Sequence, residues 1–159
     1  MNGVIAAIAL GSNLGDRRAH LDFAIPKLTH FLHDLKVSAY YETDPVGVSG
    51  PQPRFVNAGA VGTATITARE LLEALLAIER ARGRERPYVN APRTLDLDLV
   101  LFGDAVIDEP DLQVPHPRFR ERRFVLEPLA EIAPSLRDPV TGRTICELFR
   151  QMSGTNGFG

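Results

Sequence analysis

The stretch Thr94–Phe102 reads Thr-Leu-Asp-Leu-Asp-Leu-Val-Leu-Phe and places a leucine at every second position. Side chains on a β-strand alternate between two faces, so this pattern predicts a strand with one apolar face. The leucines expected to face the core are Leu95, Leu97, Leu99 and Leu101. Asp96 and Asp98 lie on the other face with Thr94 and Val100, so two carboxylates point in the same direction.

The sequence on both sides of this strand alternates predicted strands with predicted helices. The predicted strands are Val4–Leu10, Leu35–Thr43, Phe55–Thr63, Thr94–Phe102 and Ala105–Ile107. Helices are predicted from a cap at Asp16 to Leu32, from a capping box at Thr67 to Gly83, near Phe119–Ile132 and over Ile145–Met152. Gly11–Asp16 and Asp44–Arg54 are predicted to be loops. The first strand–helix–strand–strand–helix–strand order predicts an α+β, ferredoxin-like βαββαβ core, with helices packed on a mostly antiparallel sheet.

Length and composition favour one folded domain over residues 1–159, with 153–159 as a frayed tail. A hydrophobic fraction of 44% and a charged fraction of 24% exclude a disordered chain. The net charge of −2 argues against nucleic acid as a partner. The single cysteine, Cys146, fits a reducing compartment, and the apolar run Val4–Leu10 is too short to span a membrane. We therefore expect a cytoplasmic protein, and with no sign of an obligate interface, a monomer.

The paired carboxylates Asp96 and Asp98 allow two interpretations. Two carboxylates on one strand face repel each other unless a cation lies between them, and such hard oxygen ligands suit Mg²⁺. Two metal ions about 3.5–4 Å apart can hold both sides of a phosphoryl transfer. The alternative is an ordinary solvated strand face, for which alternation of leucine and aspartate is also typical. Acidic residues are nevertheless poor strand formers, which favours a functional reason for two of them.

Arginines gather on both sides of the acidic pair. The first run is Arg80, Arg82, Arg84, Arg86 and Arg93, and the second is Arg118, Arg120, Arg122 and Arg123, close to His116. The two runs hold half of the 18 basic residues, so the near-neutral total hides a locally cationic region. The guanidinium fork suits bidentate phosphate binding. The pattern indicates a small polyphosphate ligand, whereas His116 by itself could be structural or catalytic.

Six blocks of sequence, in order, resemble the 6-hydroxymethyl-7,8-dihydropterin pyrophosphokinase family of folate biosynthesis, from Ile8 to about Pro134. The blocks are Ile8–Gly15, Tyr41–Gly47, Phe55–Ala58, Ile78-Glu79 with Gly83-Arg84, Pro92–Gly103, and Val114–His116 with Arg122 and Phe124. The resemblance implies an enzyme that transfers pyrophosphate from ATP to the hydroxymethyl group of the pterin and releases AMP. ATP would be a co-substrate, and both substrates would be small molecules.

The same resemblance implies a role for each matching residue. Asp96 and Asp98 would hold two Mg²⁺ ions, and Arg84 and Arg93 would act with them in catalysis. The residues implied to bind ATP are Glu79, Arg84, Arg93, His116 and Arg122. The residues implied to bind the pterin are Thr43, Val46, Phe55, Asn57 and Phe124. Whether Asp96 accepts the proton of the substrate hydroxyl or only orients that hydroxyl stays open.

The chain departs from the family pattern in one loop and also at Phe55 and Pro117, where relatives commonly carry a tyrosine and an aromatic residue. Two other functions remain as alternatives. Val89 and Asn90 stand where relatives carry a basic residue and a tryptophan, and this chain has no Trp. The segments Asp44–Arg54 and Arg84–Asn90 are expected to order when substrates bind. One alternative is another two-metal nucleotide enzyme, such as a nucleotidyltransferase. The other is a catalytically silent ferredoxin-like module that binds a small ligand.

Overall fold

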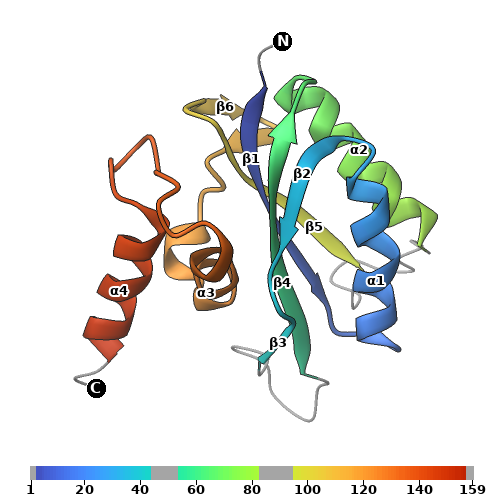
Figure 1. Ribbon diagram of the computed structural model, residues 1–159, viewed down its shortest axis with the longest axis horizontal. Coiled ribbons are helices and arrows are strands. Elements are labelled where there is room, and N and C mark those ends of the chain that lie inside the picture. The colour runs from blue at the N-terminus through green and yellow to red at the C-terminus, as the bar shows by residue number, and fades with distance from the viewer. Residues whose placement is uncertain (1–2, 44–53, 83–94, 157–159) are drawn as a thin grey trace.

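A computed structural model describes residues 3–43, 54–82 and 95–156, except for the side chains of 153–156. An antiparallel five-stranded sheet divides the molecule into two layers of helices (Figure 1). Its strands are β1 (Val4–Ser12), β2 (Leu32–Val37), β3 (Tyr41–Thr43), β4 (Phe55–Ala64) and β5 (Asp96–Phe102). They lie in the order β2-β4-β1-β5, with β3 paired to the other end of β4. This order and the antiparallel pairings confirm the predicted α+β, ferredoxin-like core.

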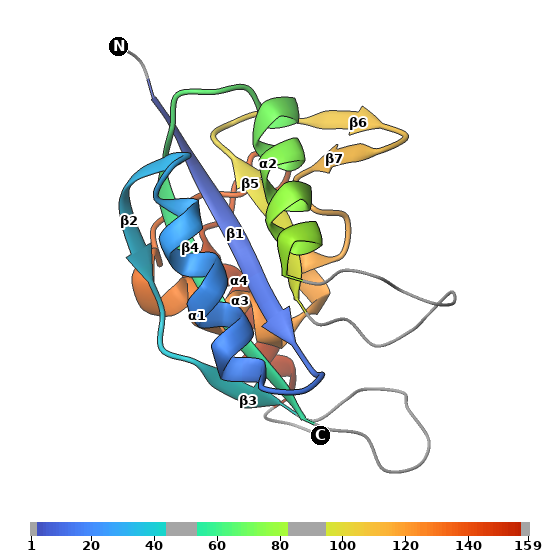
Figure 2. The same ribbon diagram turned by 90° about the vertical axis from the view of Figure 1, so that its right-hand side faces the viewer.

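Helices cover both faces of the sheet. Helices α1 (Arg17–Leu28) and α2 (Ala68–Ala81) pack on one face, where Figure 2 shows them in front of β1 and β5. The 3₁₀ turn η1 (Phe119–Glu121) and helices α3 (Arg123–Ile132) and α4 (Ile145–Asn156) pack on the opposite face. Strands β6 (Ile107–Glu109) and β7 (Leu112–Val114) form a separate hairpin after β5.

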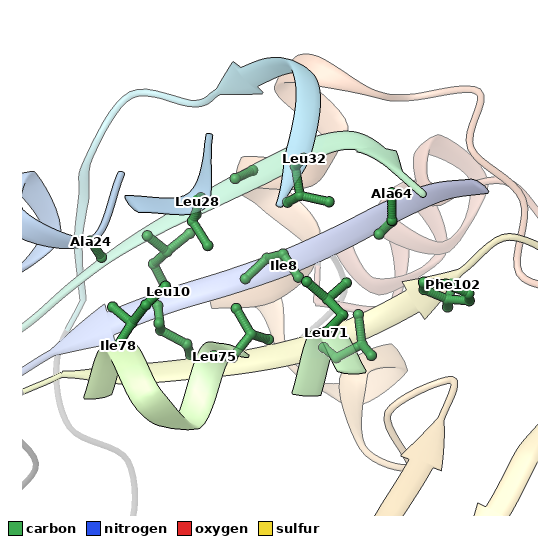
Figure 3. Close-up of a cluster of buried hydrophobic side chains, with 14 of the residues drawn as sticks. Ile8, Leu10, Ala24, Leu28, Leu32, Ala64, Leu71, Leu75, Ile78 and Phe102 are labelled. Carbon is green, nitrogen blue, oxygen red and sulfur yellow. The ribbon is translucent and has the colours of Figure 1, made fainter. Parts of the chain in front are cut away.

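The sheet therefore has a hydrophobic core on each side. The core under α1 and α2 contains Ile8 and Leu10 of β1 against Leu71, Leu75 and Ile78 of α2 (Figure 3). The core under α3 and α4 contains Ala7 and Ala9 of β1 against Leu126, Leu129 and Ile145. Each strand of a sheet buried on both faces carries apolar residues in consecutive positions. The continuous apolar run of β1 follows from this arrangement.

The predicted caps of α1 and α2 are present. Asp16 Oδ1 accepts a hydrogen bond from the Ala19 N–H at 3.2 Å. Thr67 and Glu70 form a complete capping box, in which each side chain bonds the backbone N–H of the other. Helix α1 runs through Pro26 and ends two residues later at Leu28, so the prediction that Leu32 belongs to this helix is wrong. A proline inside a helix lacks the N–H that the continuing turn needs, which fits an early end.

Three predicted strand boundaries are wrong. Gly11 and Ser12 belong to β1 rather than to a loop, because Gly11 pairs with β4 on one side and with β5 on the other. The single strand predicted over 35–43 is divided into β2 and β3. Between them the Ser38 hydroxyl accepts a hydrogen bond from Gly59 N–H at 2.9 Å, and so takes over one backbone bond of the ladder. The strand predicted at 105–107 lies instead in the β6–β7 hairpin.

The predicted core face of β5 is right for three leucines and wrong for Leu101. The register against β1 shifts so that Leu99 pairs with Ile8 and Leu101 with Ala7, which leaves Val100 as an extra residue. Such a β-bulge reverses the side-chain alternation beyond it. Leu101 therefore lies with Val100 in the core under α3 and α4, while Leu95, Leu97 and Leu99 lie in the core under α1 and α2.

The C-terminal part contains more helix than predicted. The stretch near 119–132 divides into η1 and α3, and α4 continues four residues beyond the predicted end at Met152. Within the three described ranges, no helix is both long and apolar enough to cross a membrane.

Candidate active site

The site is organised by a row of residues that crosses three strands of the sheet. Gly11 of β1 pairs with Asn57 of β4 on one side and with Asp96 of β5 on the other. Residues directly opposite each other on antiparallel strands direct their side chains to the same face. Val56 and Ala58 lie in the core under α1 and α2, so Asn57 points to the opposite face, toward the α3 and α4 layer. Asn57 and Asp96 therefore stand on either side of a glycine.

Gly11 puts no side chain between these two polar side chains. A Cβ built on Gly11 would lie 3.1 Å from Asn57 Oδ1, which is closer than most real Cβ contacts. The absence of a side chain thus leaves room beside the amide oxygen of the buried Asn57. Sequence reasoning treated Gly11 only as part of a turn and missed this role. Its signal was the position of the glycine at the end of an apolar strand.

Thr43, Phe55 and Asn57 gather at one end of the row. Asn57 is buried, and its Nδ2 donates to Thr43 Oγ1 at 2.7 Å. Because Thr43 pairs with Phe55 on β4, the Phe55 side chain shares the face of Asn57. The structure therefore brings together three of the five residues implied to bind the pterin.

Phe124 and Arg122 come from the entrance of α3. The Arg122 guanidinium carbon lies 5.6 Å from the centre of the Phe124 ring. The Arg122 carbonyl accepts hydrogen bonds from Val125 and Leu126 N–H at 3.0 Å, so Arg122 marks the start of the helix. Phe124 is partly buried against the core under α3 and α4, the side of the sheet that Phe55 and Asn57 face.

The opposite end of the row is Asp96, and Asp98 and His116 belong to the same part of the site. The two carboxylates are half-buried on one face of β5, as predicted from the alternation. The backbone N–H of His116 donates to Val100 O at 2.9 Å, which fixes the His116 segment beside β5. The bulge at Val100, which sequence alone did not reveal, falls at this attachment point.

The pKa of the His116 imidazole lies below its ordinary value. Burial lowers the pKa of His116, and Arg122 and Arg118 lower it further, whereas Asp96 acts in the opposite direction. Nδ1 accepts a hydrogen bond from Arg118 N–H at 3.2 Å, so the ring proton is on Nε2 and is available to a ligand. The electrostatic influence of Arg122 and Asp96 shows that both lie near this ring.

A cavity of about 280 Å³ opens beside β5. Its apolar walls include Leu72 of α2, Leu99 of β5 and Leu112 of β7, and its polar lining includes Asp98 and His116. A volume of this size is near the lower end of the range for small-molecule sites. The cavity therefore connects Asp98 to an apolar recess between α2 and the β6–β7 hairpin.

Glu79 has a partner within the protein. Its Oε2 accepts a hydrogen bond from Leu97 N–H at 2.7 Å, on the edge of β5 that does not pair with β1. This bond satisfies an exposed backbone donor between the two aspartates and ties α2 to β5. The role of Glu79 as an ATP ligand stays a prediction.

Several predicted site residues lie outside the described ranges. They are Arg84, Arg93 and Val46, together with residues 44–53 and 84–90 of the segments expected to order with substrates. Within residues 3–43, 54–82 and 95–156, no group of three or more His, Cys, Asp or Glu is arranged to hold a metal ion. Asp96 and Asp98 are two hard oxygen donors, and Mg²⁺ commonly takes one or two protein carboxylates and completes its shell with phosphate and water. The described residues thus fit a metal ion bound together with a phosphate ligand.

Tyr41 and Glu131 are a further pair that sequence reasoning did not assign. Tyr41 OH donates to Glu131 Oε1 at 2.6 Å, and Ala39 N–H donates to both carboxylate oxygens of Glu131. The contact joins β3, which carries Thr43, to α3, which carries Phe124. Tyr41 stood in a block of sequence typical of the family, but its partner is 90 residues away and had no local signal.

On this α+β fold an acidic pair, an imidazole and an arginine lie near one another and near a cavity, an arrangement that suits a phosphate-transfer enzyme. The family model described as 7,8-dihydro-6-hydroxymethylpterin-pyrophosphokinase matches residues 7–134. The chain belongs to this family, which confirms the resemblance found in its sequence. It is accordingly a pyrophosphokinase of folate biosynthesis, with ATP as co-substrate.

Individual relatives agree over most of their length. The chain is 44% identical over 143 residues to the 2-amino-4-hydroxy-6-hydroxymethyldihydropteridine pyrophosphokinase of Pseudomonas aeruginosa, covering 89% of this chain and 87% of the relative. It is 41% identical over 160 residues to the enzyme of the same name from Bacillus subtilis, covering 97% and 95%.

Solved structures confirm the fold. A crystal structure of an HPPK-DHPS protein in complex with substrates matches with a TM-score of 0.78 at 12% identity, over 98% of this chain and 44% of that one. The HPPK-DHPS of Plasmodium falciparum matches with a TM-score of 0.74 at 16% identity, over 94% and 45%. The chain therefore spans less than half the length of these solved chains.

Proposed function

We propose that this chain transfers the pyrophosphoryl group of ATP to the hydroxymethyl group of 6-hydroxymethyl-7,8-dihydropterin and releases AMP. The observation that carries the proposal is the row formed by Asn57, Gly11 and Asp96. In this proposal the flat ring lies beside Asn57 and Gly11, next to a carboxylate that suits a metal-bound phosphate. Both substrates would meet above Gly11.

The Asn57 end of the row suits the pterin. A pterin is flat and carries hydrogen-bonding groups around its edge. Asn57 Nδ2 donates a hydrogen bond to Thr43 Oγ1, so the Oδ1 atom of Asn57 remains as an acceptor beside Gly11. The aromatic rings of Phe55 and Phe124 can supply stacking, which gives affinity, while Asn57 identifies the edge of the ring.

The cavity beside β5 suits the nucleotide. The N–H of Leu97 points away from β1 toward Glu79, so the backbone groups of Leu99, two residues on, point to the same open edge. Leu99 also lines the cavity, together with Leu72 and Leu112. Apolar walls beside this strand edge, which pairs with no other described strand, can hold a purine base, with the phosphates directed to Asp98 and His116.

The reaction itself requires positioning and charge neutralisation. The hydroxyl oxygen of the pterin bonds to the β-phosphorus of ATP, the bond from that phosphorus to the α–β bridging oxygen breaks, and AMP leaves with this oxygen. Two Mg²⁺ ions held by Asp96 and Asp98 would neutralise phosphate charge when bound. His116 would donate its Nε2 proton as a hydrogen bond to a phosphate oxygen, and Arg122 would pair with the same charge.

In this proposal Asp96 is the acceptor considered for the proton of the attacking hydroxyl. Asp96 stands next to Gly11 and thus next to the expected hydroxymethyl group. Its carboxylate could accept the proton or orient the hydroxyl, and the two roles differ in the pH dependence of kcat. Arg84 and Arg93 are proposed to complete the charge neutralisation.

Substitution of the acidic pair tests this proposal. Asp96→Asn and Asp98→Asn each keep the size of the side chain but weaken a metal ligand, so we expect pterin-dependent ATP consumption to fall at least about a hundredfold. Asp104→Asn is the matched control, because Asp104 is exposed in the turn after β5. Activity that survives both substitutions in the pair, or that falls equally in the control, would contradict the proposal.

A further inference from the structure

The carboxylate of Asp138 is completely buried and accepts four hydrogen bonds. Two come from one arginine: Arg120 Nε donates to Oδ2 at 2.6 Å and Nη2 donates to Oδ1 at 3.0 Å. The other two come from Val140 N–H at 3.0 Å and from the Thr141 hydroxyl at 2.7 Å. The arginine and the two further donors together use every lone pair of the carboxylate. The Arg120–Asp138 pair therefore has essentially one geometry.

The partners of this pair come from two different segments. Arg120 lies in η1, in the middle of the second arginine run. Asp138 lies in the connection between α3 and α4, beyond residue 134, where the match to the family model ends. Asp138 is itself fixed, because its N–H donates to Arg143 O at 2.8 Å and its carbonyl accepts from Gly142 N–H at 2.8 Å.

The arginines of the second run therefore have different partners. Arg120 points inward to Asp138 and lies 4.8 Å over the ring of Phe119. Arg123 pairs with Glu127 and lies over the ring of Phe149, which belongs to α4. Arg122, between them, is the member that lies over Phe124 and influences His116. The sequence suggested that the whole run binds phosphate, but Arg120 is already used by the protein.

The η1 turn lies between His116 and Arg122, two residues that are predicted to bind the nucleotide. Phe119 N–H donates to His116 O at 3.3 Å, and Arg122 N–H donates to Phe119 O at 3.2 Å. Phe119 is fully buried in the core under α3 and α4. The turn is thus fixed at two adjacent positions, by the Phe119 ring in the core and by the Arg120 fork on Asp138.

We propose that Arg120 and Asp138 form a positioning pair that holds His116 and Arg122 in the geometry needed to bind the phosphates of the nucleotide. This inference rests on the proposed function. The pair touches no substrate itself. It acts through the short turn, in the way that buried partners behind a ligand-binding residue set the orientation of that residue.

The test measures two affinities separately. Asp138→Asn removes the charge that orients Arg120, so we expect the affinity for a non-hydrolysable ATP analogue with Mg²⁺ to fall about tenfold by calorimetry. The affinity for 6-hydroxymethyl-7,8-dihydropterin should stay within about twofold of the wild type, because the pterin contacts lie on β3, β4 and Phe124. Arg120→Lys keeps a cation but loses the fork, and we expect it to weaken analogue binding in the same direction.

Two control variants separate positioning from stability. Glu127→Gln breaks the neighbouring surface ion pair to Arg123 and should leave both affinities unchanged. Leu148→Ala truncates a buried residue of α4 in the same core and should lower the melting temperature without selective loss of analogue binding.

Each outcome decides between the inference and the proposed function. Analogue affinity within about twofold of the wild type in Asp138→Asn, or in Arg120→Lys if the first variant does not fold, would overturn the inference. An equal loss in Leu148→Ala would overturn it as well. If the wild type binds neither the analogue nor the pterin, it is the proposed function that fails.

Discussion

At the scale of single residues, Gly11 matters to the proposed function because it has no side chain. It lies in the middle of the row between Asn57 and Asp96, where any larger residue would occupy the space proposed for the substrate ring. The backbone of Gly11 is ordinary strand, so its value lies in the space it leaves rather than in an unusual conformation. This distinguishes it from Gly103 and Gly142, whose positive φ angles favour glycine.

Gly11→Ala should separate pterin binding from folding. The added methyl group would lie 3.1 Å from Asn57 Oδ1, in the proposed seat of the ring. We expect the affinity for 6-hydroxymethyl-7,8-dihydropterin to fall about tenfold, with little change in the affinity for an ATP analogue or in the melting temperature. Titration calorimetry with each ligand checks this, and an unchanged pterin affinity would place the ring elsewhere.

Tyr41 gives a pH-dependent test at the same scale. Its hydrogen bond to Glu131, together with burial, raises the pKa of Tyr41 to about 12. A phenol whose folded-state pKa lies above its unfolded value of about 10 contributes stability below pH 10 and loses that contribution as pH rises toward 12. We expect Tyr41→Phe to lower the free energy of unfolding by about 1 kcal/mol at pH 8.

The difference between Tyr41→Phe and the wild type should then shrink as the pH rises between 10 and 12, because only the wild type has the phenol to ionise. Urea unfolding curves at a series of pH values measure it. A difference that does not change over this range would mean that the Tyr41–Glu131 bond does not control the titration.

At the scale of elements, sequence predicts local features well and pairing poorly. The capping box at Thr67 and the alternation that brings Asp96 and Asp98 to one face were both predictable, because each depends on residues a few positions apart. The bulge at Val100 was not, since it depends on the register between β1 and β5. The β6–β7 hairpin, which lines the cavity beside β5, was misplaced because its short strands carry little alternating pattern.

The capping box of α2 provides a prediction for stability without a change in function. Thr67→Ala removes the side-chain bond to Glu70 N–H and should lower the free energy of unfolding by about 1 kcal/mol. Thr65→Ala is the control, because Thr65 is exposed and precedes the cap. Equal effects of the two variants in urea unfolding would show that the cap contributes nothing specific.

At the scale of the whole molecule, the site lies where one end of the sheet meets the second helical layer. The predicted ferredoxin-like core accounts for the sheet with α1 and α2, and the carboxylate pair was located within it from sequence alone. The sequence did not predict that α3 and α4 cover the opposite face of the sheet, because the pattern of a single short helix does not reveal which face it covers. The contacts Tyr41–Glu131 and Arg120–Asp138 depend on that cover, so neither was predictable.

The charge distribution of the molecule agrees with a small anionic substrate. The net charge of −2 alone argues against nucleic acid, and half of the 18 basic residues gather in two runs of sequence. In the described part of the chain, Arg122 of the second run lies at the site with His116 and Asp96, while Arg120 holds the turn in place. The positions of the charged residues in the fold, rather than the net charge of the chain, therefore favour a small anionic ligand.

Product analysis tests the central claim most directly. The purified protein is incubated with ATP, Mg²⁺ and 6-hydroxymethyl-7,8-dihydropterin, and the nucleotides and pterins are separated and quantified. We expect AMP and the pterin diphosphate to form in equal amounts, and neither to form without the pterin. Release of ADP or of free pyrophosphate, or AMP formation independent of the pterin, would contradict a pyrophosphoryl transfer to the hydroxymethyl group.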